Sequence, residues 1–556
     1  MCGIWAYLTK QKKDSNSIDE FVKSFNKLVG RGPDNSIITN YNNLGYLGFH
    51  RLSIMDISDN GNQPFYLEVD NRKMVLICNG EIYNHKELIN DYSLNVNSRS
   101  DCEVILHLYN KFGIDKLISL LDGVFAFLII DHDETTGKTV SYACRDRIGV
   151  RPMFYGYNDN FDEIGFCSVV SGLSGLFNNI NVFTPGTYMK YDYNEKNISI
   201  TEYYKFKYEI ENSDSDNLEN VYMNNIKSLF IDSVKKRLIS DRPICCLLSG
   251  GLDSSLVASV AARLLGSDNK LHTFSIGMDN ATDMAFAKMV SDHIGSEHHI
   301  INITKQDALK SIRDVIFATE TYDITTIRAS VGQYLVSKAI SDGYKYKVVL
   351  SGDGSDELTS GYLYNYNAPS LDDLHKEAEK RLKEIHLYDS LRADRATSIH
   401  GLELRVPFLD SKFVDYYMSI KPEYRIPNSE RMEKYLLRKS FEEDNYLPNE
   451  VLYRKKEAFS DGISSKEESW YETIQKYIET LVSDEEYSLN VDKYTFNKPH
   501  SKESYYYRKV FGELFDEKYS NVIPEFWMPN WSGESKEPSA RVLSVYSETK
   551  SNVEEL

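Results

Sequence analysis

The sequence has 556 residues, 41% of them hydrophobic, and its 83 acidic and 64 basic side chains give a formal net charge of −19. This length predicts more than one domain. The acidic balance argues against a nucleic-acid partner, which selects clustered Lys and Arg. No apolar run reaches the roughly 18 residues of a membrane helix, and the first residues lack the pattern of a signal peptide. Seven Cys residues without a CxxC pair predict no disulfide framework. We therefore expect a protein of the reducing cytoplasm, without nucleic-acid or membrane partners.

The first 200 residues contain short apolar runs separated by turn-rich segments, which is typical of β-strands. The clearest runs cover 74–78, 124–130 and 140–145, and 183–192 reads as the last strand region of this half. The polar, acidic segment 211–220 follows and indicates a linker. We predict a first domain over 2–210, a second over 211–545, and a loosely held tail over 546–556.

In the second domain, strands and helices alternate along the chain, which predicts a mostly parallel α/β sheet. The pattern turns mainly helical from about residue 371. The expected strands are 244–249, 271–277, 298–303 and 347–352, and the expected helices are 251–265, 281–295 and 307–320.

Cys2 follows only the initiator Met, and a small second residue permits removal of that Met. The chain would then begin with a Cys that carries both a thiol and a free α-amine. An α-amine has an ordinary pKa of roughly 7.7–8, so it can act as the base for its own thiol. By itself, a Cys at this position is weak evidence for catalysis.

Four segments that follow Cys2 in the sequence strengthen the case that it is catalytic. They are RGPD at 31–34, FHRLSIMD at 49–56, NGEIYNH at 79–85 and SDCEVI at 100–105. In this order they resemble the class II glutamine amidotransferases, whose N-terminal-nucleophile (Ntn) sandwich hydrolyses glutamine through the first Cys of the mature chain. One departure is Gly30, where relatives often carry His before RGPD.

The resemblance implies a role for each matched residue. Arg51 and Asp101 would hold the carboxylate and amino ends of glutamine, Asn79 and the Gly80 amide would form the oxyanion hole, and Glu81 would help to hold the substrate amino group. The loop after Arg51 would complete the glutamine site with Leu52, Ser53, Ile54 and Met55.

LLSGGLDSS at 247–255 lies between an expected strand and an expected helix. Its glycines permit a close approach of the backbone, and a helix N-terminus offers free N–H groups to an anion. Ser249 and Ser254 add hydroxyl donors, whereas Asp253 would repel a bare phosphate. A bridging Mg²⁺ explains that carboxylate, because Mg²⁺ takes one or two carboxylates together with phosphate oxygens.

This loop resembles the SGGxDS pyrophosphate loop of the ATP pyrophosphatases, which cleave ATP to AMP and pyrophosphate. The resemblance implies that Leu248 and Ile276 contact the adenine, and that Asp253 and Asp356 are the Mg²⁺ candidates. The residues implied to bind ATP are Leu248, Ser249, Gly250, Gly251, Asp253, Ser254, Ile276, Ser351 and Gly352.

An amidotransferase domain joined to an ATP-pyrophosphatase domain resembles the asparagine synthetases of eukaryotic type over residues 2–545. Further matching segments lie at 320–330, 391–395, 400–410, 454–462, 501–511 and 527–531. The implied substrates are glutamine, aspartate and ATP, with Mg²⁺ as cofactor. Arg328 and Lys456 are candidates for binding aspartate or phosphate, and family analogy alone makes a homodimer possible.

Asp353 is a second departure, because most of the family carries Glu there, and the resemblance implies that this position is catalytic. Asp keeps the carboxylate, but its reach is shorter by roughly 1–1.5 Å, and misplacement on that scale can cost about a hundredfold in rate. Three interpretations are open. The backbone shifts to compensate, activity is reduced, or the synthetase step is altered or lost.

Three other functions remain as alternatives. A β-lactam-forming synthetase is opposed by the retained Cys2, since those relatives typically lose it. A catalytically weak homologue with a regulatory role is favoured only by Asp353. A stand-alone glutaminase is opposed by the complete SGGLDSS loop at 249–255.

Overall fold

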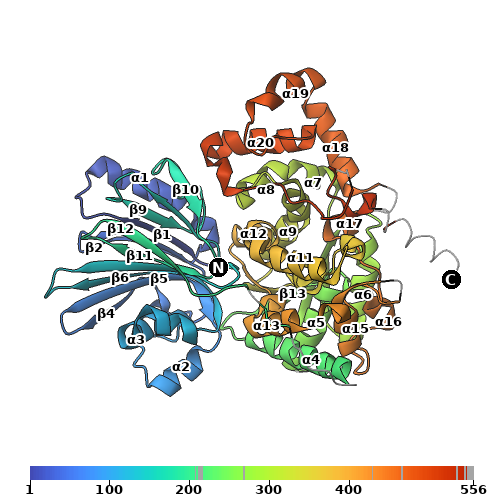
Figure 1. Ribbon diagram of the computed structural model, residues 1–556, viewed down its shortest axis with the longest axis horizontal. Helices are drawn as coiled ribbons and strands as arrows, with labels where there is room; N and C mark the ends of the chain where they lie inside the picture. Colours follow the sequence, from blue (N-terminus) through green and yellow to red (C-terminus); the bar gives the residue numbers. More distant parts are fainter. Residues whose placement is uncertain are drawn as a thin grey trace.

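The computed structural model describes residues 1–206, 208–210, 217–266, 269–428, 430–464, 468–533, 536–543 and 546. Figure 1 shows two bodies side by side, a β-sandwich from the first 200 residues and a larger body of helices around a sheet. The start of the chain lies where the two bodies meet. This placement puts the predicted nucleophile at the contact between the domains.

The first body contains two six-stranded antiparallel sheets. One consists, in order, of β10 (Asn179–Val182), β8 (Phe154–Tyr157), β9 (Ile164–Cys167), β1 (Gly3–Leu8), β3 (Gly45–Arg51) and β2 (Asn35–Tyr41). The other consists of β12 (Asn197–Glu202), β11 (Thr187–Asp192), β7 (Thr139–Arg145), β6 (Gly123–Asp133), β5 (Arg72–Ile82) and β4 (Phe65–Val69).

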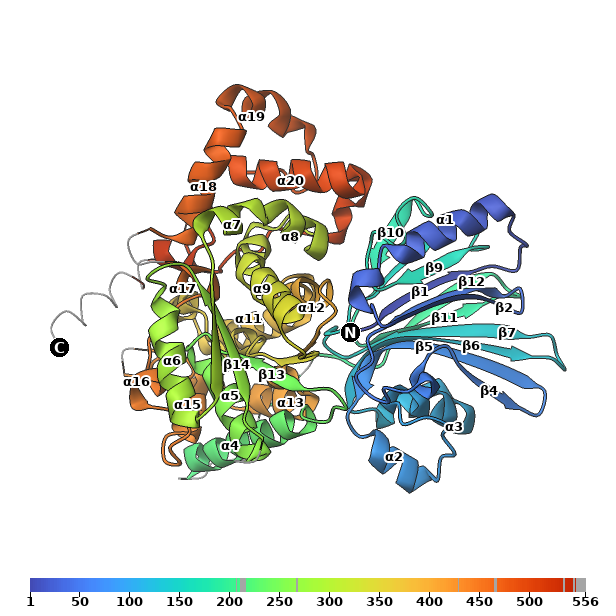
Figure 2. The same ribbon diagram turned by 180° about the vertical axis from the view of Figure 1, so that it is seen from behind.

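Helices cover the outer faces of both sheets, which makes a four-layer αββα arrangement (Figure 2). Helix α1 (Ser15–Asn26) covers the first sheet, and α2 (His85–Tyr92) and α3 (Val104–Leu120) cover the second. Because side chains alternate along a strand, Ile4 and Ala6 of β1 enter the core between the sheets, while Trp5 and Tyr7 pack beneath α1. This alternation fixes the position of β1 and of the residue before it.

The predicted runs 74–78, 124–130 and 140–145 lie within β5, β6 and β7. The prediction that 183–192 holds the last strand of this half is wrong, because β12 follows it. Five of the six β12 side chains are exposed, so this edge strand lacks the buried apolar residues on which the prediction relied. The reading as strands and turns also missed α1, α2 and α3.

The second body contains a five-stranded parallel sheet, which confirms the predicted α/β pattern. Its strands, in order, are β15 (Glu297–Asn302), β14 (His272–Gly277), β13 (Ile244–Leu247), β16 (Val348–Leu350) and β17 (Glu403–Arg405). Helix α4 (Leu218–Lys236) precedes β13. The helices between β13 and β16 are α5 (Leu252–Leu265), α6 (Thr282–Ile294), α7 (Lys305–Lys310), α8 (Ile312–Thr319) and α9 (Ile324–Gly343).

The single helix predicted over 307–320 is two helices that meet at Ser311, and β17 was not predicted. The predicted linker 211–220 is wrong from Leu218 onward, since α4 begins there, and 211–216 lie outside the described residues. The predicted tail 546–556 lies outside them too, except for residue 546.

Short helices make up most of the remaining chain, as predicted from about residue 371. They are α10 (Ser355–Thr359), α11 (Leu371–Glu384), α12 (Asp389–Ser398), α13 (Ser411–Ser419), α14 (Pro422–Arg425), α15 (Tyr435–Ser440), α16 (Asn449–Leu452), α17 (Phe459–Gly462), α18 (Trp470–Leu481), α19 (Asp484–Asn490) and α20 (Lys502–Phe515). Within the described ranges, no helix combines the length and apolar character needed to cross a bilayer.

Candidate active sites

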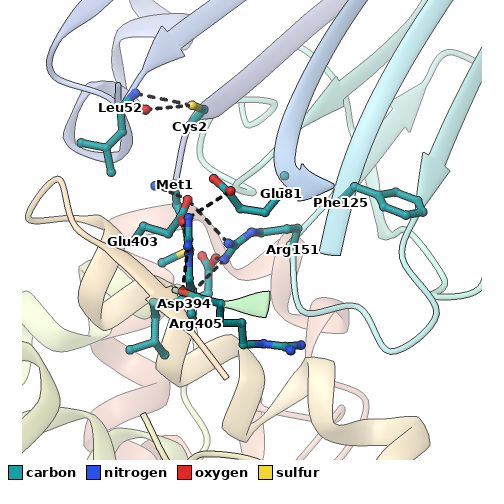
Figure 3. A network of polar contacts seen from close by, with 12 residues as sticks. Met1, Cys2, Leu52, Glu81, Phe125, Arg151, Asp394, Glu403 and Arg405 are labelled. Atoms are coloured by element: carbon teal, nitrogen blue, oxygen red, sulfur yellow. Dashed lines mark hydrogen bonds and ion pairs between the residues drawn. The ribbon is translucent and has the colours of Figure 1, made fainter. Parts of the chain in front are cut away.

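Cys2 immediately precedes β1, and its thiol points at the loop that follows β3 (Figure 3). The Leu52 N–H donates to Sγ at 3.4 Å, and Sγ lies 3.7 Å from the Leu52 carbonyl oxygen. The Arg31 Nε–H donates to the Cys2 carbonyl oxygen at 3.0 Å. Burial raises the pKa of the thiol to about 11 while Met1 is attached. The sulfur is therefore held in place as a neutral thiol in this form of the chain.

The loop predicted to bind glutamine is braced from inside by Arg51. Its guanidinium donates to the Ser58 carbonyl at 2.7 Å and to Asn62 Oδ1 at 2.8 Å, and it also contacts the Asp56 carbonyl. Asp34 of the RGPD segment accepts from the Ser53 N–H at 2.8 Å. These contacts fix the backbone from Leu52 to Met55 beside Cys2.

Asn79 and Glu81 lie on the face of β5 that faces the other sheet, because they alternate with Cys78 and Gly80 along the strand. The Asn79 side chain is fully buried, yet neither its nitrogen nor its oxygen has a hydrogen-bond partner among the described residues. An unpaired buried amide costs roughly 1–3 kcal/mol. An unpaired buried amide of this kind is suited to donate a hydrogen bond to a bound substrate.

Gly80 has no room for a side chain, because a Cβ there would lie 2.6 Å from the Val124 carbonyl oxygen. Asp101 is buried and accepts from the Ile82 N–H at 2.6 Å. Burial raises the pKa of its carboxyl. Strand β5 therefore carries Asn79, Gly80 and Glu81 together, and the hydrogen bond to Ile82 holds Asp101 beside its end.

A buried network of ion pairs joins this neighbourhood to the second domain (Figure 3). Arg405 of β17 pairs with Glu81 at 3.0 Å and with Glu403 at 2.8 Å. Glu403 also lies 3.5 Å from the Met1 amine. Burial opposes the ionisation of Glu403, but Arg405, the Met1 amine and Arg151 together lower its pKa to about 2.

The RGPD segment docks on the second domain as well. Arg31 pairs with Asp394 of α12 at 2.7 Å and donates to Ser398 at 2.9 Å. Gly30 packs so closely there that a Cβ would lie 2.7 Å from the Ile399 carbonyl oxygen. A larger residue at position 30 therefore requires a different approach of this segment to α12.

A cavity of about 230 Å³ opens at the carboxyl ends of β13, β14 and β16. Parallel sheets bind ligands at this edge. Most predicted ATP residues line it, namely Leu248, Ser249, Gly251, Asp253, Ser254, Ile276, Ser351 and Gly352. Asp353, Asp356 and Lys456 line it too.

Gly250 is the exception among the predicted ATP residues and is not part of this lining. Its φ of +78° and a contact of 2.4 Å from a built Cβ to the Ala287 N make it a turn-forming residue. The turn lets α5 begin at Leu252 with Ser249 and Ser254 hydroxyls 3.0 Å apart at its start. Gly251, Leu252, Asp253 and Ser254 of this first turn line the cavity.

Two acids and two lysines meet at the cavity wall. The Lys434 Nζ lies 2.5 Å from Asp253 and 2.6 Å from Asp356, and the Lys456 Nζ lies 2.6 Å from Asp356. Burial opposes the ionisation of Asp356, but the two lysines hold its pKa well below the usual range. The carboxylates of Asp253 and Asp356 therefore converge on a common cation position.

Asp353 is anchored rather than free. Arg392 Nη2 pairs with its Oδ1 at 2.7 Å, and the Ser351 hydroxyl donates to its Oδ2 at 2.5 Å. Arg392 in turn donates to Gln333 at 2.6 Å. The Asp353 carboxylate, on a side chain shorter than Glu, is thus held in a defined position in the cavity.

Arg328, the other phosphate or aspartate candidate, is not brought to the cavity. Thr325, Ala329 and Gln333 of α9 line the cavity at helical spacing, and Arg328 points elsewhere. Its guanidinium pairs with Glu503 at 2.6 Å and also contacts Glu537. Both partners belong to the carboxyl-terminal part of the chain.

Sequence reasoning missed Lys434 and Arg392 as site residues. Arg392 stands in a segment, 391–395, that was noted only for its resemblance. Lys434 is 2% exposed and has a φ of 62°, and no motif around it indicates a site. A buried Lys on an irregular loop is visible only in three dimensions.

Two family models match the chain and together cover nearly all of it. One, described as a glutamine amidotransferase domain, matches residues 1–203, and the other, described as asparagine synthase, matches residues 225–373 and 366–543. The chain is thus a two-domain protein that joins an amidotransferase to a synthetase domain.

Curated relatives extend over the whole chain. An asparagine synthetase [glutamine-hydrolyzing] of Gallus gallus is 43% identical over 570 residues, which cover 98% of this chain and 99% of that protein. The proteins of the same name from Homo sapiens and Rattus norvegicus are each 42% identical over 575 residues. The chain belongs to the family of glutamine-hydrolysing asparagine synthetases.

Proposed function

We propose that this protein makes asparagine from aspartate, using glutamine as the nitrogen donor and ATP as the energy source. L-Aspartate, L-glutamine, ATP and water give L-asparagine, L-glutamate, AMP and diphosphate. The observation that carries the proposal is one buried ionic network that joins the Cys2 site to β17, beside the strand that leads into the ATP cavity. Full-length relatives of that name support it.

The glutaminase half begins with removal of Met1, which gives Cys2 a free α-amine next to its thiol. That amine takes the thiol proton, and the sulfur attacks the side-chain amide carbon of glutamine. The C–N bond breaks as ammonia leaves with a proton. Water then cleaves the thioester, which releases glutamate and restores the thiol. The αββα layers around Cys2 support assignment of this domain, over 2–210, to the Ntn hydrolases.

The oxyanion of the tetrahedral intermediate would be stabilised by the Asn79 side chain and the Gly80 N–H. A preorganised donor of this kind is worth roughly 2.7–4 kcal/mol in the transition state. The unpaired state of the buried Asn79 amide supports this role. Arg51 acts mainly through the loop that it braces, because its guanidinium already donates to three oxygens of that loop.

The synthetase half, over 211–545, would bind ATP with its phosphates at the start of α5. An oxygen of the aspartate side chain attacks the α-phosphorus, diphosphate leaves, and β-aspartyl-AMP forms. Ammonia then attacks the β-carbonyl carbon, AMP leaves, and the nitrogen loses a proton. Lys456 and Lys434 would neutralise the leaving diphosphate, and Asp353, which pairs with Arg392, would accept that proton.

The donor set fits Mg²⁺, because the Asp253 and Asp356 carboxylates already converge on one ammonium group. Bound there with ATP, Mg²⁺ would offset the negative charge of the phosphates. Lys434 must move aside from one carboxylate for that exchange, and the phosphates give it a new partner. We further propose a cytoplasmic location and a homodimer, on family analogy.

An assay of pure protein with glutamine, aspartate, ATP and Mg²⁺ tests the proposal. Equal amounts of asparagine, glutamate and diphosphate are expected. Glutamate without diphosphate would instead identify a glutaminase. Diphosphate formed equally without aspartate would exclude aspartate as the substrate.

A further inference from the structure

Three metal-ligand side chains meet at the edge of the parallel sheet that lies away from the ATP cavity. His272 is the first residue of β14, and Glu297 and His299 belong to the neighbouring edge strand β15. His272 and Glu297 are register partners. Alternation puts His299 on the same face of the sheet as Glu297. Within the described parts of the chain, this is the one group in which three such ligand atoms lie within 4.8 Å of one another.

The spacing of the three ligand atoms matches the size of a transition-metal ion. His272 Nδ1 and His299 Nε2 are 3.0 Å apart, and each lies 3.7 Å from Glu297 Oε1. A triangle with these sides has a centre about 2.0 Å from every corner, whereas Zn–N and Zn–O bonds measure roughly 2.0–2.2 Å. An ion slightly above the plane of the triangle reaches all three atoms with little change in their positions.

We propose that His272, Glu297 and His299 form a binding site for a divalent transition-metal ion such as Zn²⁺, separate from the Mg²⁺ of the ATP cavity. Imidazole nitrogens select zinc, copper or nickel over magnesium, which prefers oxygen ligands. The ATP cavity opens at the other end of β14, where Phe274, Ser275 and Ile276 line it. Four residues of strand, roughly 13 Å, separate Ile276 from His272.

The two histidines must reorient to bind an ion. Their rings are nearly parallel, at 8°, with centroids 5.3 Å apart, and His272 Nδ1 and His299 Nε2 lie within hydrogen-bonding distance of each other. To bind the ion, each ring turns so that a nitrogen lone pair faces the common centre. Glu297 is half-exposed and leaves the fourth position to solvent. A site with three protein ligands and one water follows.

The expected consequence is stabilisation of the sheet edge. Edge strand β15 pairs with β14 alone in this sheet, and a metal bridge ties its amino end to β14. Tyr344 packs against the His299 ring at 4.8 Å and Tyr346 against the His272 ring at 5.0 Å. These aromatic rings limit how far the imidazoles can turn and keep both near the bridging position.

Zinc binding to the full-length protein tests this proposal. The parent carries Cys2→Ala, so that the thiol does not compete, and excess Mg²⁺ occupies the oxygen-rich site of the cavity. Equilibrium dialysis with Zn²⁺ compares this parent with His299→Ala and with Glu297→Gln, which changes a half-exposed side chain and preserves its shape. His293→Ala is the matched control, because it removes an exposed His of α6 that contacts the Asn445 carbonyl.

The parent and the His293→Ala variant are expected to bind the same high-affinity zinc equivalent. His299→Ala and Glu297→Gln are expected to weaken it at least tenfold, and zinc should raise the melting temperature of the parent but not of these two variants. Equal zinc affinity in the parent, His299→Ala and Glu297→Gln would overturn the proposal. An equal loss in His293→Ala would show non-specific binding to surface histidines and would overturn it as well.

Discussion

The two candidate sites handle negative charge in different ways. Around Cys2, the group proposed to stabilise the oxyanion is the neutral Asn79, whose buried amide has no hydrogen-bond partner among the described residues. In the ATP cavity, Asp253 and Asp356 are already paired with Lys434 and Lys456. In the proposed reactions, the first site stabilises a negative charge that develops only during catalysis, which suits an unpaired donor. The second site would bind phosphates that carry charge throughout, which suits ions that are present from the start.

Arg405 is the point at which the two regions meet. Its guanidinium pairs with Glu81 of the first domain, while its carbonyl accepts from the N–H of Ser351, at 3.0 Å, in the loop of the ATP cavity. Substitutions in either site, or at Arg405 between them, can therefore test whether the two sites work independently.

Cys2→Ala should have the largest effect on activity. Glutamine-dependent asparagine formation is expected to fall by roughly 10⁴-fold or more, because the nucleophile is lost. Synthesis from added ammonium should remain within about twofold of the parent, since the ATP cavity is untouched. Steady-state assays with each nitrogen donor measure both. A comparable loss with ammonium would contradict the separation of the two sites.

Arg405→Met breaks the junction. Glu81 and Glu403 would then lose the cation that they share, although Glu403 keeps Arg151 and the Met1 amine. The loss is expected to cost about 3–5 kcal/mol of unfolding free energy. Urea denaturation measures this loss. Exposed Arg313, which pairs with Glu513 at the surface, gives the matched control: Arg313→Met should change stability by less than about 1 kcal/mol. Equal stability of the two variants would show that the network contributes nothing to the contact between domains.

Asn79→Ala removes the side-chain donor proposed for the oxyanion hole. Glutaminase kcat is expected to fall by roughly 10²–10³-fold. Because the amide has no hydrogen-bond partner among the residues that the structure describes, its removal should leave the unfolding free energy unchanged or higher. Gln63→Ala is the contrasting control, since Gln63 exchanges hydrogen bonds with the Cys78 backbone and its loss should destabilise the fold. A large destabilisation by Asn79→Ala would point to a structural role.

Asp356→Asn tests the charged site. Synthesis with either nitrogen donor is expected to fall by about a hundredfold, since one of two converging carboxylates is lost. Glutamine hydrolysis measured without ATP should not change. A matching fall in glutaminase activity would show that the two sites are not chemically independent.

Asp353→Glu is expected to give the smallest effect. Arg392 and Ser351 already hold the Asp353 carboxylate, so a longer side chain displaces it, and asparagine formation should fall by about tenfold. Initial rates of asparagine formation at saturating ammonium isolate this step. A large gain would mean that the native site is compromised by the shorter residue.

Several features were predictable because their residues are adjacent in the chain. The turn and the first helical turn after β13 lie within 247–255, so the backbone proposed to bind phosphate could be predicted from adjacent residues. Cys2, the strand β5 with Asn79 and Glu81, and the alternation of the parallel sheet were likewise local patterns. The edge strand β12 and the helices α1 to α3 were not predicted, because exposed strands and short amphipathic helices have weak hydrophobic patterns in the sequence.

The sequence by itself was enough to predict glutamine hydrolysis, ATP-dependent activation and the α/β character of the second domain. Strand periodicity and short motifs depend only on neighbouring residues. Only the tertiary structure decided which charges meet. Lys434 reaches Asp253 across 181 residues of chain, Arg405 joins the two domains, and Arg328 turns toward Glu503 instead of the cavity. Such pairs depend on how distant elements pack, because a buried charge is stabilised by a counter-ion that can come from any part of the chain. Short sequence patterns therefore do not identify that partner.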